Sequence, residues 1–238
     1  MNSKSNVYAL ILAGGKGSRM GNSEKPKQFL EICSKPIIIY TIEKFMLYNS
    51  FEKIIVLAPK QWVKTTEDII AKYFPENDRI AVVCGGPTRN ETILNGINYI
   101  EDNLSIDEDT IIVTHDAVRP FVTHRIITEN IESAKKYGAC DTVIPATDTI
   151  VVDDKNNFID DIPDRSKMNQ GQTPQSFKAL TLKRHYQTLT SEEKEILTDA
   201  CKIMLLKGEK VHLVQGEVFN IKITYPFDIK MATAILEG

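Results

Sequence analysis

The chain has 238 residues, of which 42% are hydrophobic and 26% are charged, and its formal net charge is −3. This length can bury a substantial core in one large α/β domain or in two small ones. The small negative charge lacks the basic excess of a general nucleic-acid binder, so we expect no nucleic-acid partner.

The four cysteines are scattered along the chain without a CxxC pair: Cys33, Cys84, Cys140 and Cys201. This spacing predicts free thiols in a reducing compartment and argues against a disulfide framework or a zinc site. The first residues, MNSKSN, contain no apolar h-region, and no apolar run approaches the ~20 residues that a membrane-spanning helix needs. We therefore expect a cytoplasmic protein without a membrane partner.

Apolar runs alternate with helical patterns over more than half of the chain. Strands are predicted at 7–13, 53–58, 80–85, 110–116 and 141–146, and helices at 36–47, 61–74, 91–104 and 123–137. Continuous apolar strands separated by helices are typical of a mostly parallel sheet with helices on both faces, a three-layer Rossmann-like α/β fold. In such sheets, ligands bind beyond the carboxyl ends of the strands.

The segment TIVVDDKNNFIDDIP, residues 149–163, interrupts this alternation. Two short alternating stretches flank DKNN, which predicts a β-hairpin. Such a hairpin is either an ordinary surface feature or a dimerisation arm.

The remainder of the chain returns to helices and strands. We predict a helix at 191–207, strands at 211–214 and 219–224, and a final helix from Pro226. Because no Gly/Ser linker or low-complexity tract is present, we predict a single domain over 1–238 with an arm at about 147–171.

The first strand runs into the glycine-rich sequence ALILAGGKGSRMG, residues 9–21, followed by KPKQF. Glycines beside Arg19 and Lys27 predict a backbone that contacts phosphate, with positive φ angles at some glycines. A dinucleotide site would need an acidic residue at the end of the second strand, where the sequence is Ala58-Pro59-Lys60. The Walker sequence GxxxxGK[ST] is also absent, so hydride transfer and P-loop hydrolysis are both disfavoured.

Three further stretches carry residues suited to phosphate chemistry. HDAVRP (115–120) ends a strand, and its Asp116 is either a Mg²⁺ ligand or a turn cap. His115 is better explained as a packed, hydrogen-bonded residue. GGPTRNET (85–92) is either a nucleoside-binding turn or a glycine turn with a helix cap. In NIKIT (220–224), Lys222 either extends to water or faces an anion.

Together these stretches resemble a known family. LAGGKGSRM, PKQF, GGPTRNET, HDAVRP, QGQTPQSF, LTDA and NIKIT occur in this order across nearly the whole chain. The set is similar to the cytidylyltransferases that join CTP to a polyol phosphate. These include the methylerythritol-phosphate enzymes of isoprenoid synthesis and the ribitol-5-phosphate enzymes of teichoic acid and capsule synthesis, which contribute to cell wall biogenesis.

The resemblance implies an α/β nucleotidyltransferase that uses Mg²⁺ and forms a homodimer through the hairpin arm. It assigns catalytic roles to Arg19, Lys27, Arg165 and Lys222, with Arg165 reaching the neighbouring subunit's site. It assigns CTP contacts to Leu12, Ala13, Gly14, Gly15, Gly17, Gly85, Gly86, Arg89, Asn90, Thr92, Asp116, Ala117 and Arg119. Asp116 would bind the metal, while Thr149, Thr173 and Thr198 match polar substrate positions less closely.

The phrases HDAVRPF, DTVIPATDTI, QGQTPQSF and ILTDACKI resemble the ribitol-5-phosphate branch, as does LAGG where the methylerythritol branch would have LAAG. The expected reaction is therefore transfer of CMP from CTP to D-ribitol 5-phosphate, giving CDP-ribitol and pyrophosphate. The near alternative is 2-C-methyl-D-erythritol 4-phosphate as acceptor. Two other classes are a sugar-1-phosphate nucleotidyltransferase and a non-catalytic nucleotide-binding module, although the retained charged residues argue against the latter.

Overall fold

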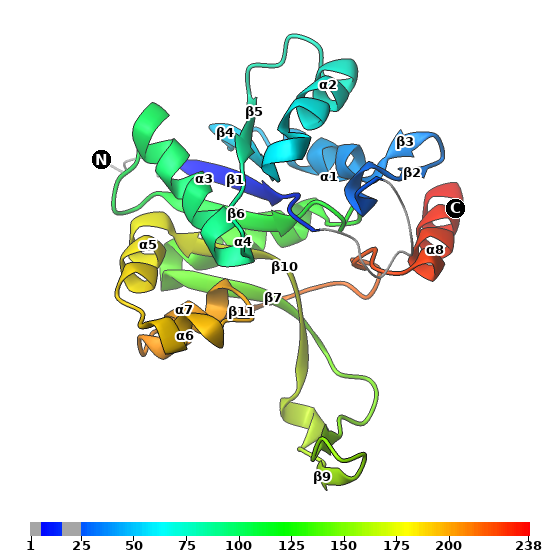
Figure 1. Cartoon of the computed structure of the whole chain (residues 1–238), viewed down its shortest axis with the longest axis vertical. Coiled ribbons are helices and arrows are strands. Elements are labelled where there is room, and N and C mark those ends of the chain that lie inside the picture. Colours follow the sequence, from blue (N-terminus) through cyan, green and yellow to red (C-terminus); the bar gives the residue numbers. More distant parts are fainter. Residues whose placement is uncertain (1–5, 16–24) are drawn as a thin grey trace.

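The computed structural model describes residues 6–15 and 25–238. Its centre is a seven-stranded sheet with the order β11-β7-β10-β6-β1-β4-β5 (Figure 1). The strands are β1 (Val7–Leu12), β4 (Lys53–Ala58), β5 (Ile80–Cys84), β6 (Ile111–Asp116), β7 (Ala139–Pro145), β10 (Asn169–Lys178) and β11 (His212–Gln215). β10 is antiparallel to both its neighbours, whereas the other pairings in this sheet are parallel. The prediction of a mostly parallel α/β sheet is confirmed.

Helices cover both faces of the sheet, as the alternation of strands and helices predicts. One face packs against α1 (Ile37–Met46), α2 (Val63–Tyr73) and α4 (His124–Tyr137). The other face packs against α3 (Arg89–Asn103), α5 (Ala179–Gln187) and α7 (Ala200–Leu206). β1 contributes to both cores because its side chains alternate: Ile11 lies in the first core and Leu10 in the second.

A third, smaller core joins the C-terminal helix to the edge of the domain. Helix α8 (Pro226–Glu237) buries Ala232 against Ile32 and Ile223. Ile32 belongs to the short strand β2 (Glu31–Ile32), which pairs with β3 (Lys35–Pro36). This packing brings the segment before α8 next to the chain that follows the glycine-rich loop.

The predicted hairpin is present as β8 (Val152–Asp153) and β9 (Ile159–Asp161), and it extends away from the sheet (Figure 1). Apolar side chains on it are exposed, including Phe158 at 73% and Ile159 at 64%. The 3₁₀ turn η4 (Arg165–Lys167) then leads into β10. β10 therefore connects the hairpin directly to the middle of the sheet.

Two sequence predictions about local structure are wrong, and one strand was not predicted. The helix predicted at 191–207 is two helices, α6 (Ser191–Glu195) and α7, because Asp199 caps a new helix by accepting from the Lys202 N–H at 3.1 Å. The strand predicted at 219–224 has no ladder partner. Strand β10 was not predicted, because Pro174 lacks an N–H and normally argues against a central strand.

Two short 3₁₀ turns complete the described elements, η2 (Lys27–Phe29) and η3 (Lys60–Trp62). All four cysteines are free thiols, as predicted. No helix in the described ranges combines the length and apolar character needed to span a membrane.

Candidate functional site

A cavity of about 340 Å³ lies at the carboxyl ends of β1 and β6, beside the start of α3. This is the edge of the sheet where the sequence predicts ligand binding. The described residues that line it are Leu12, Ala13, Gly14, Gly15, Lys27, Gln28, Gly86, Pro87, Thr88, Arg89, Thr92, Asp116, Ala117, Val118, Lys222 and Thr224. Four segments distant in sequence therefore share one site with β1.

The turn η2 fixes one side of the cavity. Gln28 donates its side-chain N–H to the Ala13 carbonyl at 2.6 Å, and the Lys27 ammonium donates to the Ile223 carbonyl at 3.1 Å. Lys27 is only 7% exposed, so its charge is held at the cavity wall with most of its stem buried. A cation held in this way is already placed for an anion and loses little freedom when it binds one.

The glycines at the end of β1 leave room in the cavity. A Cβ at Gly14 would meet no protein atom within 4 Å, and one at Gly15 would lie 3.6 Å from the Lys27 Cε. Packing therefore does not require glycine at Gly14. Positive φ was predicted in this loop, but neither Gly14 nor Gly15 adopts it. Their contribution is open space beside the backbone, which suits a ligand that approaches closely.

The start of α3 forms a second wall. Thr88 caps the helix by accepting from the Glu91 N–H at 3.2 Å, and the Glu91 carboxylate accepts from the Thr88 N–H at 3.1 Å. The Thr92 hydroxyl donates to the Thr88 carbonyl at 2.8 Å and accepts from the Gly86 N–H at 3.0 Å. A Cβ at Gly86 would lie 2.6 Å from the Glu91 Cβ, so this glycine is required by the turn itself.

Asp116 lies at the centre of the charged part of the site. Its carboxylate forms an ion pair with Arg89, and the Lys222 ammonium lies 2.7 Å from its Oδ2. The Arg119 Nε is 3.9 Å from the same oxygen. Burial alone would raise the pKa of Asp116, but these three cations outweigh it and hold the pKa well below its usual range. The carboxylate is therefore ionised at any physiological pH.

The donor chemistry of Asp116 fits a magnesium ion. Among the described residues that line the cavity, it is the single carboxylate. Mg²⁺ takes oxygen ligands and is usually held by one or two carboxylates together with substrate phosphates. Arg89 and Lys222 already neutralise Asp116, so a metal ion held by this carboxylate would have to share it with these cations or displace them.

His115 is a packed residue rather than a ligand, as the sequence suggests. It is fully buried, and burial lowers its pKa to about 4, so the ring is neutral. Its Nε2 lies 3.0 Å from the Arg119 carbonyl, which only accepts, so Nε2 carries the proton. The Thr173 hydroxyl therefore donates to Nδ1 at 3.0 Å and accepts from the Asp116 N–H at 3.2 Å. This chain of bonds fixes the backbone at Asp116.

Eleven of the predicted CTP and catalytic residues line the cavity: Leu12, Ala13, Gly14, Gly15, Lys27, Gly86, Arg89, Thr92, Asp116, Ala117 and Lys222. Gly85, Asn90 and Arg119 are not among the described residues that line it. Arg119 donates to the Asn220 carbonyl at 2.7 Å and so holds the segment that carries Lys222. Gly17 and Arg19 lie outside the described residues.

The remaining predicted residues lie elsewhere. Arg165 is exposed on the arm, where it donates to the Thr147 carbonyl at 2.9 Å, and it does not line the cavity of its own chain. Thr173 is buried beside Asp116, whereas Thr149 and Thr198 are exposed.

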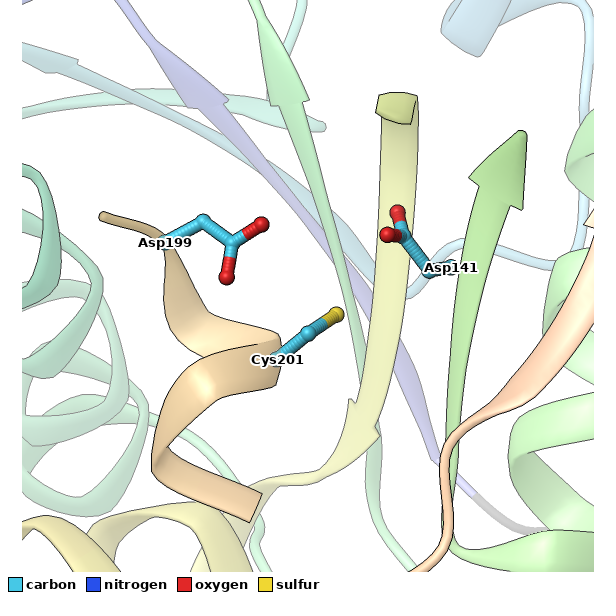
Figure 2. Close-up of side chains that lie close together, drawn as sticks. All are labelled: Asp141, Asp199 and Cys201. Carbon is cyan, nitrogen blue, oxygen red and sulfur yellow. The ribbon is translucent and has the colours of Figure 1, made fainter. Parts of the chain in front are cut away.

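Sequence reasoning missed a second polar group near this edge of the sheet. Ligand atoms of Asp141, Asp199 and Cys201 lie within 4.8 Å of one another, and their side chains point toward a common space (Figure 2). Asp141 follows an alanine and a cysteine in β7, and Asp199 is a helix cap, so neither has a sequence pattern that marks a site.

The comparisons with known proteins agree with this fold. The family model described as IspD, 2-C-methyl-D-erythritol 4-phosphate cytidylyltransferase, matches residues 7–238. A 4-diphosphocytidyl-2C-methyl-D-erythritol synthase from Anaerococcus prevotii has 26% identity and a TM-score of 0.80, covering 99% of this chain and 97% of that one. The 2-C-methyl-D-erythritol 4-phosphate cytidylyltransferase of Francisella tularensis has the same identity and TM-score, covering 97% of this chain and 99% of that one.

The family match spans the whole described sheet, the cavity at its edge and the arm. It also includes every stretch from which the sequence predicts a nucleotidyltransferase. The chain therefore belongs to the IspD family and is a CTP-dependent cytidylyltransferase.

Proposed function

We propose that this chain transfers CMP from CTP to the phosphate group of a polyol phosphate and releases pyrophosphate. The observation that carries the proposal is the gathering of Lys27, Arg89 and Lys222 around one cavity, in which Asp116 is the single carboxylate among the described lining residues. An oxygen of the acceptor phosphate attacks the α-phosphorus of CTP, and the bond from that phosphorus to the β-phosphate oxygen breaks.

The main obstacle to this reaction is electrostatic, because both reactants are anions. Cations held before the substrates arrive lower this barrier, and the reaction needs neither a covalent nucleophile nor a strong general base. Lys27 and Lys222 bind phosphate oxygens, and the N–H groups beside Gly14 and Gly15 approach the triphosphate. Asp116 would hold Mg²⁺, which supplies charge neutralisation and orients the phosphates when bound.

The identity of the acceptor has two candidates, each with its own support. The comparisons favour 2-C-methyl-D-erythritol 4-phosphate, because the family model and the similar structures carry that name. D-ribitol 5-phosphate is favoured by the phrases HDAVRPF, QGQTPQSF and ILTDACKI and by LAGG at 12–15. The first acceptor belongs to isoprenoid synthesis and the second to wall or capsule polymers. The comparisons support the first better than the second.

An acceptor panel tests the function directly. Pyrophosphate release is measured with CTP, UTP, ATP or GTP against methylerythritol phosphate, ribitol 5-phosphate or glycerol 3-phosphate, with and without Mg²⁺. We expect release with CTP and one five-carbon polyol phosphate, at a kcat/KM at least tenfold above every other pair. Equal turnover with UTP, or preference for a sugar 1-phosphate, would overturn the proposal.

We also propose that two copies associate through the arm, and that Arg165 serves the partner's site. The exposed apolar side chains of the hairpin support an association surface: Val151, Val152, Phe158, Ile159 and Ile162. Arg165 is a cation on this arm that does not line the cavity of its own chain.

Mixing two inactive variants tests this arrangement. An Arg165→Ala chain keeps its own Lys27, and a Lys27→Ala chain can supply Arg165 to its partner. We expect the mixture to recover up to about one quarter of wild-type activity, because random pairing gives half heterodimers with one complete site each. Activity equal to the sum of the separate variants would contradict the exchange across the dimer.

A further inference from the structure

A polar group made by Asp141, Gln175 and Asp199 lies on the sheet beside the cavity. The Gln175 Nε2 donates to the Asp141 Oδ1 and to the Asp199 Oδ2, both at 3.1 Å. The three residues come from β7, β10 and the cap of α7, and Figure 2 shows the two carboxylates turned toward each other. Both aspartates are half-buried, so a ligand can still reach them.

Gln175 shows that this group is incomplete. Its side chain is 2% exposed, and its Oε1 is buried without a hydrogen-bond partner in the described parts of the chain. The reverse orientation of the amide would place this oxygen against two carboxylates, so the carboxylates determine how it points. A buried amide oxygen without a donor lowers the stability of the folded chain. A ligand that donates a hydrogen bond here would recover this stability.

The register of the sheet places the group next to Asp116. Gln175 lies opposite Asp141 on one side and opposite Thr114 on the other, and Thr114 is two residues before Asp116. Residues two apart on a strand share a face, so Asp116 and this group lie on the same side of the sheet. The charge of Arg89, which lines the cavity, lowers the pKa of Asp141 in opposition to the larger effect of burial.

The surroundings leave the group open on one side. A Cβ at Gly171 would lie 3.7 Å from the Asp141 Oδ2, so a side chain at this position would cover part of that oxygen. Asp141 and Asp199 also repel each other, and together with burial this raises the pKa of Asp141 to about 6. The group is therefore rich in acceptors and poor in donors.

We infer that Asp141, Gln175 and Asp199 bind hydroxyl groups of the acceptor polyol, at the end of the site away from the reacting phosphates. This inference rests on the polyol-phosphate transfer proposed above. Hydroxyls are neutral donors, so they match carboxylate oxygens and the free amide oxygen of Gln175. The negative charge repels the phosphate end of the acceptor toward Lys222 and Arg89. The same residues thus bind the polyol and set its direction.

A metal ion is a poorer occupant of this space. The Gln175 amide already places its N–H groups between the carboxylates, where a cation would lie. Burial and the two aspartates raise the pKa of the Cys201 thiol, which therefore stays protonated and is a weak ligand. Binding of Zn²⁺ or Mn²⁺ by this group is therefore an alternative that can be measured.

The test compares Asp141→Asn and Asp199→Asn with Asp102→Asn, a matched change at an exposed aspartate of α3. Asparagine keeps the size of the side chain and the helix cap at 199. Each site variant should raise the KM of the preferred polyol phosphate about tenfold, as expected for weakening one hydrogen bond to a charged group. The Kd of CTP, measured by calorimetry without acceptor, should stay within twofold of wild type and also confirms folding.

Four other results have distinct meanings. Glycerol 3-phosphate, used as a competitive inhibitor, lacks the distal hydroxyls, so its inhibition constant should be the same in all variants. Absence of transfer by the wild-type protein would overturn the proposed function itself. Transfer by the wild type with an acceptor KM unchanged in both site variants would overturn only this inference. Zn²⁺ or Mn²⁺ binding that is lost in Asp141→Asn would assign the group to a metal and also overturn it.

Discussion

Replacing Lys27 with methionine is expected to lower kcat/KM about 100-fold or more, since losing one fixed stabilising group costs on the order of 3 kcal/mol in the transition state. Methionine retains much of the buried stem, so the wall formed with Gln28 and Ile223 should remain. The measurement is steady-state pyrophosphate release with CTP and the preferred acceptor.

The matched control for this variant is Lys44→Met, at an exposed lysine of α1. It removes the same charge from the chain without changing the cavity, so its kcat/KM should remain within twofold of wild type. A loss of similar size in both variants would mean that net charge matters and that the position of Lys27 does not. A thermal melt within a few degrees of wild type shows that the Lys27 variant is folded.

Asp116→Asn is expected to separate nucleotide binding from turnover. The change removes the carboxylate that neutralises Arg89, Lys222 and Arg119, so these cations become available to the triphosphate. The Kd of CTP without a divalent ion should therefore stay the same or decrease. Turnover with Mg²⁺ should fall about 100-fold or more, because the variant lacks an ionised ligand for the metal.

Stability supplies a second measurement for the same variant. Removing one partner from a buried group of charges leaves the others uncompensated, and we expect the free energy of unfolding to fall by about 3 kcal/mol. Adding CTP should restore part of this loss, because its phosphates replace the missing negative charge. Asp102→Asn should show neither effect. Weaker CTP binding without metal in Asp116→Asn would contradict the role assigned to the three cations.

The regular part of the fold could be predicted because local sequence and burial agree there. The run KIIVLA at 53–58 forms a buried strand of the same bounds, and the helix predicted at 123–137 differs from α4 by one residue. Both segments are apolar at the positions that face the core. The hairpin was predictable for a different reason, since DKNN supplies turn residues between two short alternating stretches.

The elements around QGQTPQSF could not be predicted because tertiary contacts outweigh local preference. The segment is polar, and Pro174 opposes a central strand, yet β10 forms there because β6 and β7 both pair with it. Polar side chains are tolerated because they have partners across the sheet, as with the Thr114 hydroxyl and the Gln175 carbonyl at 3.0 Å. Such partners are known only once the sheet is assembled.

The candidate site also contains residues that local sequence predicts and residues whose positions depend on tertiary contacts. Asp116 and Lys222 were predictable because charged residues in apolar strands need a reason to be there, and Lys27 because its charge follows a glycine-rich loop suited to phosphate. The location of Arg119 was not, since its sequence neighbours give no indication that it holds the segment of Asn220. The group of Asp141, Gln175 and Asp199 joins three elements that are distant in the chain, since Gln175 bonds to Asp141 across 34 positions and to Asp199 across 24.

The position of β10 has a consequence for how the chain folds during synthesis. β6 and β7 cannot be joined in the sheet until residues 169–178 are available to lie between them. A growing chain that ends before this point has strands β1, β4, β5 and β6 in place but an unpaired edge at β6. Exposed strand edges of this kind promote pairing between chains. Truncated or stalled chains should therefore aggregate, and release of the segment 169–178 marks the point at which the domain can close.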